Sequence, residues 1–154
     1  MITHKLDLGC GKKRPIGYIG VDSYDWSDLY DSKTFICGNI PEVLTVFEDN
    51  SIERVRASHI LEHIPDIIRT FNEVYRILIP NGDFDIWVPN STSKGAFADP
   101  THVRFFNDMS FRYYDMTWDP ELLKSYGITC DFKQIKIEGL DNGASIHAIL
   151  RKRG

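Results

Sequence analysis

Residues 4–22, HKLDLGCGKKRPIGYIGVD, contain two short apolar segments separated by a glycine-containing turn. Their spacing predicts one strand over residues 4–8, followed by Gly9-Cys10-Gly11, and a second strand over residues 18–21, followed by Asp22. Glycine lets the backbone approach a ligand closely, and exposed N–H groups in such a turn favour an anionic group. The stretch therefore predicts two strand ends beside a binding crevice.

Short apolar runs continue along the chain and alternate with one clear helical pattern. Further strands are expected over residues 34–37, 54–58, 84–88, 132–137 and 145–150. The last two are separated by Asp141-Asn142-Gly143, which predicts an antiparallel, hairpin-like pair. The alternation of strands with a helix predicts an α/β fold with a largely parallel sheet.

The helical pattern lies between the fourth and fifth expected strands. Pro65 suits the first turn of a helix, where its missing N–H does no harm, and Pro80-Asn81-Gly82 is expected to end the helix. The apolar residues between them have the spacing of a core-facing stripe: Ile67, Ile68, Phe71, Val74, Tyr75 and Leu78. Residues 89–127 are rich in aromatic and polar residues and are expected to form an insertion with two short helices.

Length and composition predict one ordinary domain over residues 1–154. The formal net charge of −4 argues against a nucleic-acid partner, because a general nucleic-acid binder carries surplus Lys and Arg. The sequence shows no signal peptide and no apolar run of about 18 residues, so a cytoplasmic protein without a membrane span is expected. Cys10, Cys37 and Cys130 have no metal-binding spacing and are expected to be free thiols.

Two polar residues at strand ends suggest the chemistry of the ligand. Asp22 ends the second strand, and its two acceptor oxygens suit the paired hydroxyls of a ribose. Asn39 follows the third strand, and its amide suits the edge of an adenine. With the glycine turn, these residues point to an adenosyl amino acid. A dinucleotide fits less well, because Arg14 replaces the third glycine of G-x-G-x-x-G and Asp22 lies only 11 residues after Gly11 instead of about 20.

The chain resembles the class I S-adenosylmethionine-dependent methyltransferases in five stretches that occur in order: LDLGCG (6–11), YIGVD (18–22), ICGNI (36–40), ASHILEHIPD (57–66) and FNEVYRILIPNGDFDIWVPN (71–90). The stretch containing LEH is similar to a subgroup that acts on small molecules. The resemblance implies a Rossmann-like methyltransferase fold, with a mostly parallel twisted sheet of about seven strands, the last of them antiparallel. It also implies S-adenosyl-L-methionine as the cofactor and methyl transfer as the activity.

The resemblance further implies which residues hold the cofactor. Asp7 and the turn Gly9-Cys10-Gly11 would serve its methionine end, Asp22 its ribose, Asn39 and Ile40 its adenine, and Ser58 and His59 would line the methyl-transfer side. The chain departs from the family in its reduced N-terminal helices. The helix between the first two strands is missing or reduced to a turn, and no helical region precedes the first strand, so the cofactor pocket is expected to lack part of its cover.

A second pattern, H-x-x-E-H, occurs at His59-Ile60-Leu61-Glu62-His63 and is typical of one group of zinc proteases. Two histidines four residues apart share a metal only if both lie on one helical face. Here His59 leaves a strand, and Pro65 marks the helix start after His63. We therefore expect no metal ligands, and the methyltransferase resemblance explains the pattern.

The acceptor side is expected to come from the insertion. Three histidines are candidates for a general base toward an acceptor hydroxyl: His59, His63 and His102. His102 lies in ADPTHVRFF (98–106), where Asp99, Arg104 and Phe106 are expected to contact a small-molecule acceptor or close its pocket. Two other functions stay open, a cofactor-binding module that needs a partner subunit and a methyltransferase-like domain without catalysis. A domain reduced in this way would gain from forming a homodimer.

Overall fold

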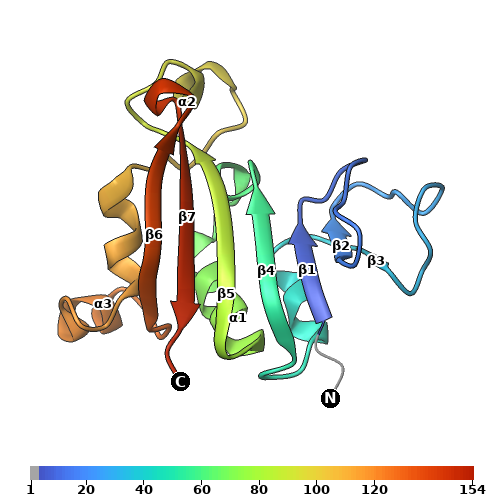
Figure 1. The fold of residues 1–154 in the computed structure, drawn as a ribbon, viewed down its shortest axis with the longest axis horizontal. Helices are drawn as coiled ribbons and strands as arrows, with labels where there is room; N and C mark the ends of the chain where they lie inside the picture. Colours follow the sequence, from blue (N-terminus) through green and yellow to red (C-terminus); the bar gives the residue numbers. More distant parts are fainter. Residues whose placement is uncertain (1–3) are drawn as a thin grey trace.

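Seven strands form one sheet in the order β3-β2-β1-β4-β5-β7-β6 (Figure 1). The computed structural model describes residues 4–154. The strands are β1 (His4–Leu8), β2 (Ile19–Asp22), β3 (Phe35–Cys37), β4 (Ile52–Ser58), β5 (Leu78–Pro89), β6 (Phe132–Leu140) and β7 (Ser145–Lys152). The first five are parallel, and β7 runs antiparallel between β5 and β6. The expected seven-stranded, mostly parallel sheet with an antiparallel last strand is confirmed.

The core lies on one side of this sheet, because every second residue of the central strands points to that side. These inward side chains are apolar and at most 2 % exposed: Leu6 and Leu8 of β1, Val55 and Ala57 of β4, Phe84, Ile86 and Val88 of β5, and Ile146, Ala148 and Leu150 of β7. Helix α1 (Ile67–Ile77) packs against them and lies behind the sheet in Figure 1.

Helix α1 forms where the apolar stripe predicts a helix. It begins after Asp66, whose side chain accepts a hydrogen bond from the Arg69 N–H at 3.2 Å and so caps the first turn. The fully buried Phe71 stacks on the ring of Tyr114, with 3.6 Å between ring centroids. Pro80-Asn81-Gly82 does not form the expected turn after the helix. Strand β5 starts at once, at Leu78, and a register shift relative to β4 accommodates these residues.

The other side of the central strands carries charged and aromatic side chains, which we call the charged face: Asp7, Arg54, Arg56, Asp83, Asp85, Trp87, His147 and Arg151. These groups pair with one another across the strands. Arg54 bridges Asp83 and Asp85 at 3.1 and 3.2 Å, and Arg151 and His147 approach the same two carboxylates at 2.8 and 2.7 Å. Parallel sheets normally have helices on both faces, but none of the helices in residues 4–154 crosses this face in Figure 1.

The connection from β1 to β2 contains no helix, as expected from its length. Its ten residues, 9–18, are held by Tyr30, whose hydroxyl donates to the Gly11 carbonyl at 2.9 Å and accepts from the Arg14 N–H at 3.2 Å. The Arg14 guanidinium lies 4.3 Å from the centre of the Tyr30 ring and also donates to the Thr34 carbonyl. Side-chain bonds therefore fix this crossover in place of a packed helix.

The insertion over residues 89–127 contains three short helices where two were expected: α2 (Gly95–Ala98), a 3-10 helix (Asp108–Tyr114) and α3 (Pro120–Ser125). Figure 1 shows α2 above the carboxyl ends of the parallel strands. Shorter 3-10 turns occupy Glu42–Val46, Leu61–His63 and Asp141–Gly143, the last of which joins β6 and β7. None of the helices in the described part of the chain is long and apolar enough to span a bilayer.

Candidate functional site

A cavity of about 190 Å³ lies at the carboxyl ends of β1, β2 and β3. In open α/β sheets this is the edge at which ligands bind. Four of the residues expected to hold the cofactor line it: Gly9, Asp22, Asn39 and Ile40. His63, a candidate general base, also lines it. The other lining residues were not among the candidates, although each directly follows a strand end or lies within the LEH stretch: Ser23, Gly38, Ile60, Ile64 and Pro65.

Asp22 is the charged group at the strand ends of this cavity. Its carboxylate accepts the Gly11 N–H and the Tyr24 N–H, each at 2.9 Å, one on each oxygen. An ionised carboxylate has about four acceptor positions, so two remain for donors from a ligand. Backbone N–H groups from the turn after β1 and from the residues after β2 thus orient this carboxylate at the cavity.

The turn after β1 brings the backbone close to the cavity, but its first two N–H groups are not free to bind a ligand. The amides of Gly9 and Cys10 both donate to the Val21 carbonyl, at 2.8 and 3.2 Å. Gly9 has a φ of +63°, and a Cβ built there would lie 2.6 Å from Cγ1 of Ile60. Because Gly9 and Ile60 both line the cavity, any side chain at residue 9 would push into its wall.

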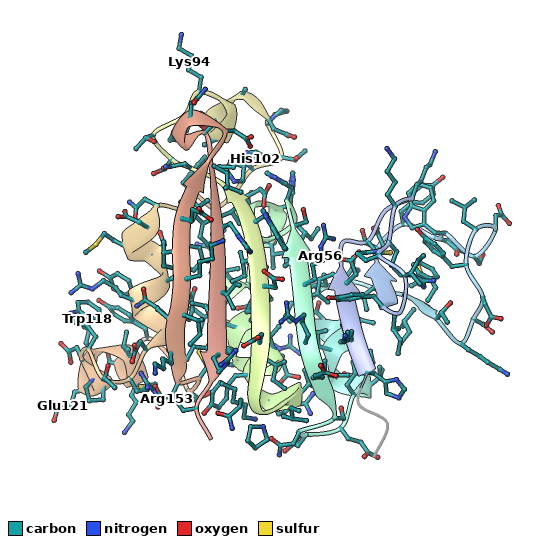
Figure 2. All side chains as sticks on the ribbon, viewed as in Figure 1. Arg56, Lys94, His102, Trp118, Glu121 and Arg153 are labelled. Carbon is teal, nitrogen blue, oxygen red and sulfur yellow. The ribbon has the colours of Figure 1, made fainter. Side chains whose placement is uncertain are left out.

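Five of the nine residues expected to bind the cofactor lie outside this lining: Asp7, Cys10, Gly11, Ser58 and His59. Gly11 instead donates its N–H to Asp22. Asp7 is fully buried on the charged face, where its Oδ1 accepts from Arg56 at 2.6 Å; Figure 2 labels Arg56 on β4. Burial raises the pKa of the Asp7 carboxyl although Arg56 opposes this shift. Cys10 packs against Gly20, and burial raises the pKa of its thiol to about 11. Ser58 ends β4 beside Trp87 of β5.

His59 also lies outside the lining and differs from the other candidate histidines in its exposure. Its side chain is half exposed, and its Nδ1 lies 3.5 Å from Oε1 of the buried Glu62. That carboxylate raises the pKa of the His59 imidazole. His59 therefore contacts Glu62 and does not line the cavity that contains His63.

The other two candidate histidines, His63 and His102, come together. His63 lines the cavity, and its ring meets that of His102 edge to face, with 4.7 Å between centroids. His63 Nδ1 lies 2.9 Å from Oγ1 of Thr101, which donates to Asp99 at 2.6 Å. Figure 2 shows His102 at the carboxyl ends of the central strands. The insertion thus reaches the cavity through these two rings.

A second cavity, of about 280 Å³, lies between α1 and the insertion. Two of the three residues expected to bind the acceptor, Arg104 and Phe106, line it; Asp99 does not. The remaining lining is mostly apolar or aromatic: Ile67, Ile68, Phe105, Ser110, Tyr113, Tyr114, Tyr126 and Ile128. Arg104 also donates to the Pro65 carbonyl, and Pro65 lines the first cavity. The segment from Pro65 to Ile67 therefore separates the two cavities.

Comparison with known proteins connects this geometry to a family. The fold is similar to that of an S-adenosylmethionine-dependent methyltransferase from Archaeoglobus fulgidus, with a TM-score of 0.71 at 19 % identity, covering 97 % of this chain and 86 % of that one. It is also similar to a Haloferax volcanii structure described as a complex with the Trm112 methyltransferase activator, with a TM-score of 0.68 at 15 % identity, covering 99 % of this chain and 84 % of that one.

Among curated proteins, sterol 24-C-methyltransferase ERG6 of Saccharomyces cerevisiae is 26 % identical and matches 63 % of this chain. The match spans only about 30 % of that relative's length. A family model described as a methyltransferase domain matches residues 6–86, which include most of β1, all of β2 to β4 and α1, and the first cavity's lining residues. By this match, over more than half of its length, the chain belongs to the methyltransferase domain family.

Proposed function

We propose that this domain transfers a methyl group from S-adenosyl-L-methionine to the hydroxyl of a small molecule. The cofactor assignment depends mainly on Asp22, whose carboxylate lies at the cavity and accepts two backbone N–H groups. This carboxylate keeps acceptor positions for the paired hydroxyls of a ribose. Asn39 and Ile40 line the same cavity and offer an amide and an apolar surface suited to an adenine. The donor set therefore fits the adenosyl part of this cofactor.

When bound, the cofactor supplies an electrophilic methyl group on its sulfonium. The residues of this chain then need to hold the acceptor in line and accept its proton. The Thr101 hydroxyl donates to Asp99, so its oxygen accepts from His63 Nδ1. In the neutral ring this leaves the lone pair of His63 on Nε2. An acceptor hydroxyl that reaches His63 in the first cavity would find a proton acceptor there.

The cofactor assignment is tested by thermal unfolding with S-adenosylhomocysteine, with NAD as the comparison ligand. At 100 times its dissociation constant, a ligand adds about 2.7 kcal/mol of stability, which raises Tm by roughly 5 to 10 °C in a domain of this size. Asp22→Asn should remove most of this shift, because a hydrogen bond to a charged group contributes about 1.5–3 kcal/mol.

Asp25→Asn is the matched control, because Asp25 makes the same local turn, accepting the Ser27 N–H at 2.9 Å, but does not line the cavity. Its shift with S-adenosylhomocysteine should equal that of the wild type. If the wild type shows no shift, or if both variants lose it equally, the assignment of the cofactor to this cavity is wrong.

A second candidate function is a cofactor-binding module completed by a partner subunit. The short crossover from β1 to β2 favours it, because no helix covers the charged face beside the cavity in the described residues. The Haloferax volcanii neighbour, described as a complex with a methyltransferase activator, gives a precedent for such an arrangement. Binding of S-adenosylhomocysteine to the purified chain alone, with a dissociation constant in the micromolar range, would argue against this candidate.

A further inference from the structure

Glu62, His63 and His102 offer one ligand atom each, and these atoms all lie within 4.8 Å of one another. We propose that these three residues bind one divalent transition-metal ion, with Zn²⁺ as the probe that tests it. The two histidines of this site are His63 and His102, whereas those of the H-x-x-E-H pattern are His59 and His63. We expected no metal ligands because His59 and His63 do not share a helical face, and His102 of the insertion was not part of that pattern.

Hydrogen bonds fix which nitrogen of His63 is free. Thr101 Oγ1 lies 2.6 Å from a carboxylate oxygen of Asp99, which only accepts, so the hydroxyl proton points to Asp99. Thr101 Oγ1 therefore accepts from His63 Nδ1, 2.9 Å away. In the neutral ring Nε2 is left with its lone pair and no donor among the described residues.

The same reasoning applies to His102. Its Nδ1 lies 2.8 Å from the Ala96 carbonyl oxygen, which only accepts, so Nδ1 carries the proton. Its Nε2 lies 3.8 Å from Oδ2 of Asp99, which is beyond a hydrogen bond. The side chain is only 8 % exposed. In metal sites the second nitrogen of a histidine ligand is typically bound in this way, which orients the ring and fixes its tautomer.

Glu62 supplies the negative charge. Its side chain is 2 % exposed, and Oε2 has no hydrogen-bond partner among the described residues. The backbone N–H groups of Val103 and Arg104 donate to the Glu62 carbonyl at 2.9 and 3.0 Å, which holds the insertion against this residue. Oε1 lies 3.5 Å from His59 Nδ1, which leaves Oε2 as a buried acceptor without a donor, and such a group is destabilising. A bound cation would satisfy all three acceptors at once.

Two histidines and one glutamate are a common ligand set for a catalytic zinc ion, which keeps its fourth position open. Ligands about 2.0–2.1 Å from a tetrahedral ion lie about 3.4 Å from one another, so the three side chains would draw together when the ion binds. His63 also lines the first cavity, so the ion would lie in its wall. If the proposed function holds, an acceptor hydroxyl on the open position would become more acidic and would pass its proton to solvent, since both histidines hold the ion.

Isothermal titration of the full chain, freed of metal with EDTA, with Zn²⁺ tests the site. We expect one equivalent to bind, and Glu62→Gln and His102→Ala to weaken it at least 100-fold. Thr101→Val should weaken it by about 10- to 100-fold, the usual effect of losing a group that orients a ligand. His147→Ala, on the charged face, is the matched control and should bind Zn²⁺ like the wild type.

A second measurement covers the case in which a variant folds poorly. The Tm of each variant in metal-free buffer shows whether it is folded, and Zn²⁺ should raise Tm in the wild type and leave the Tm of folded Glu62→Gln unchanged. No binding by the wild type, or equal binding by Glu62→Gln, would overturn the metal site. Binding of S-adenosylhomocysteine without Zn²⁺ binding overturns the metal site alone, whereas Zn²⁺ binding without S-adenosylhomocysteine binding supports the site and overturns the proposed function.

Discussion

Gly9 and Gly11 share a left-handed backbone but differ in the space around them, so the same substitution should have unequal effects. Their φ angles are +63° and +51°. A Cβ at Gly9 would lie 2.6 to 2.8 Å from three side-chain atoms of Ile60, whereas a Cβ at Gly11 would have no heavy atom within 4 Å. The backbone conformation alone costs an alanine roughly 1–2 kcal/mol. Gly11→Ala should therefore lower the free energy of unfolding by about that amount.

Gly9→Ala should lose the same amount and, in addition, about 1–3 kcal/mol for forcing the Ile60 side chain aside. Its total loss is then about 2–5 kcal/mol. Urea unfolding at equilibrium measures both values, provided that the m-value is unchanged. Because Ile60 lines the first cavity, Gly9→Ala should also weaken S-adenosylhomocysteine binding more than Gly11→Ala does. Equal losses in the two variants, or a larger loss for Gly11→Ala, would refute the steric argument.

Three further predictions concern the core, the charged face and the thiols. Phe71→Ala should lower the free energy of unfolding by about 3–5 kcal/mol in urea, because it leaves a cavity beneath the sheet. Burial raises the pKa of the Asp7 carboxyl, with Arg56 opposing it, so ionising this group costs stability. As the pH rises from about 3.9 to that raised pKa, the free energy of unfolding of the wild type should fall relative to that of Asp7→Asn. Urea unfolding across this pH range measures the difference, and a constant difference would contradict the prediction. Burial raises the pKa of the Cys130 thiol to about 12, so iodoacetamide should alkylate the exposed Cys37 of the native protein and spare Cys130, as read by mass spectrometry.

The strand ends were predictable because the signals that mark them are local. The glycine turn after β1, Asp22 after β2 and the apolar stripe of α1 each depend on a few neighbouring residues, and the structure has these elements within a few residues of their expected bounds. The expected turn at Pro80-Asn81-Gly82 was wrong. These residues lie inside β5 at the register shift between Leu78 and Asp83, where Asn81 has a positive φ. Pairing of β5 with β4 on both sides of the shift outweighed the local turn signal.

One signal in the sequence was overlooked. Arg54 and Arg56 alternate with apolar residues in β4, as do Asp83 and Asp85 in β5. Parallel strands covered on both sides are continuously apolar, so this alternation already indicates a sheet with one covered face. The pairing of His63 with His102 was not predictable in this way. It depends on the bonds from Val103 and Arg104 to the Glu62 carbonyl, between segments about 40 residues apart.

In most parallel sheets both faces are covered by helices, so both faces must be apolar. In this sheet only one face is covered, and the other is the charged face. The buried apolar side chains of the central strands point toward α1, and the opposite side pairs most of its charges with one another. Residues 12–17 and 24–33, between the first three strands, contribute no fully buried side chain. Segments inserted in these two loops would therefore leave the buried core residues in place, provided that Arg14 and Tyr30, which hold the β1–β2 crossover, are kept. A chain built in this way can gain or lose a covering layer during evolution while keeping the same core.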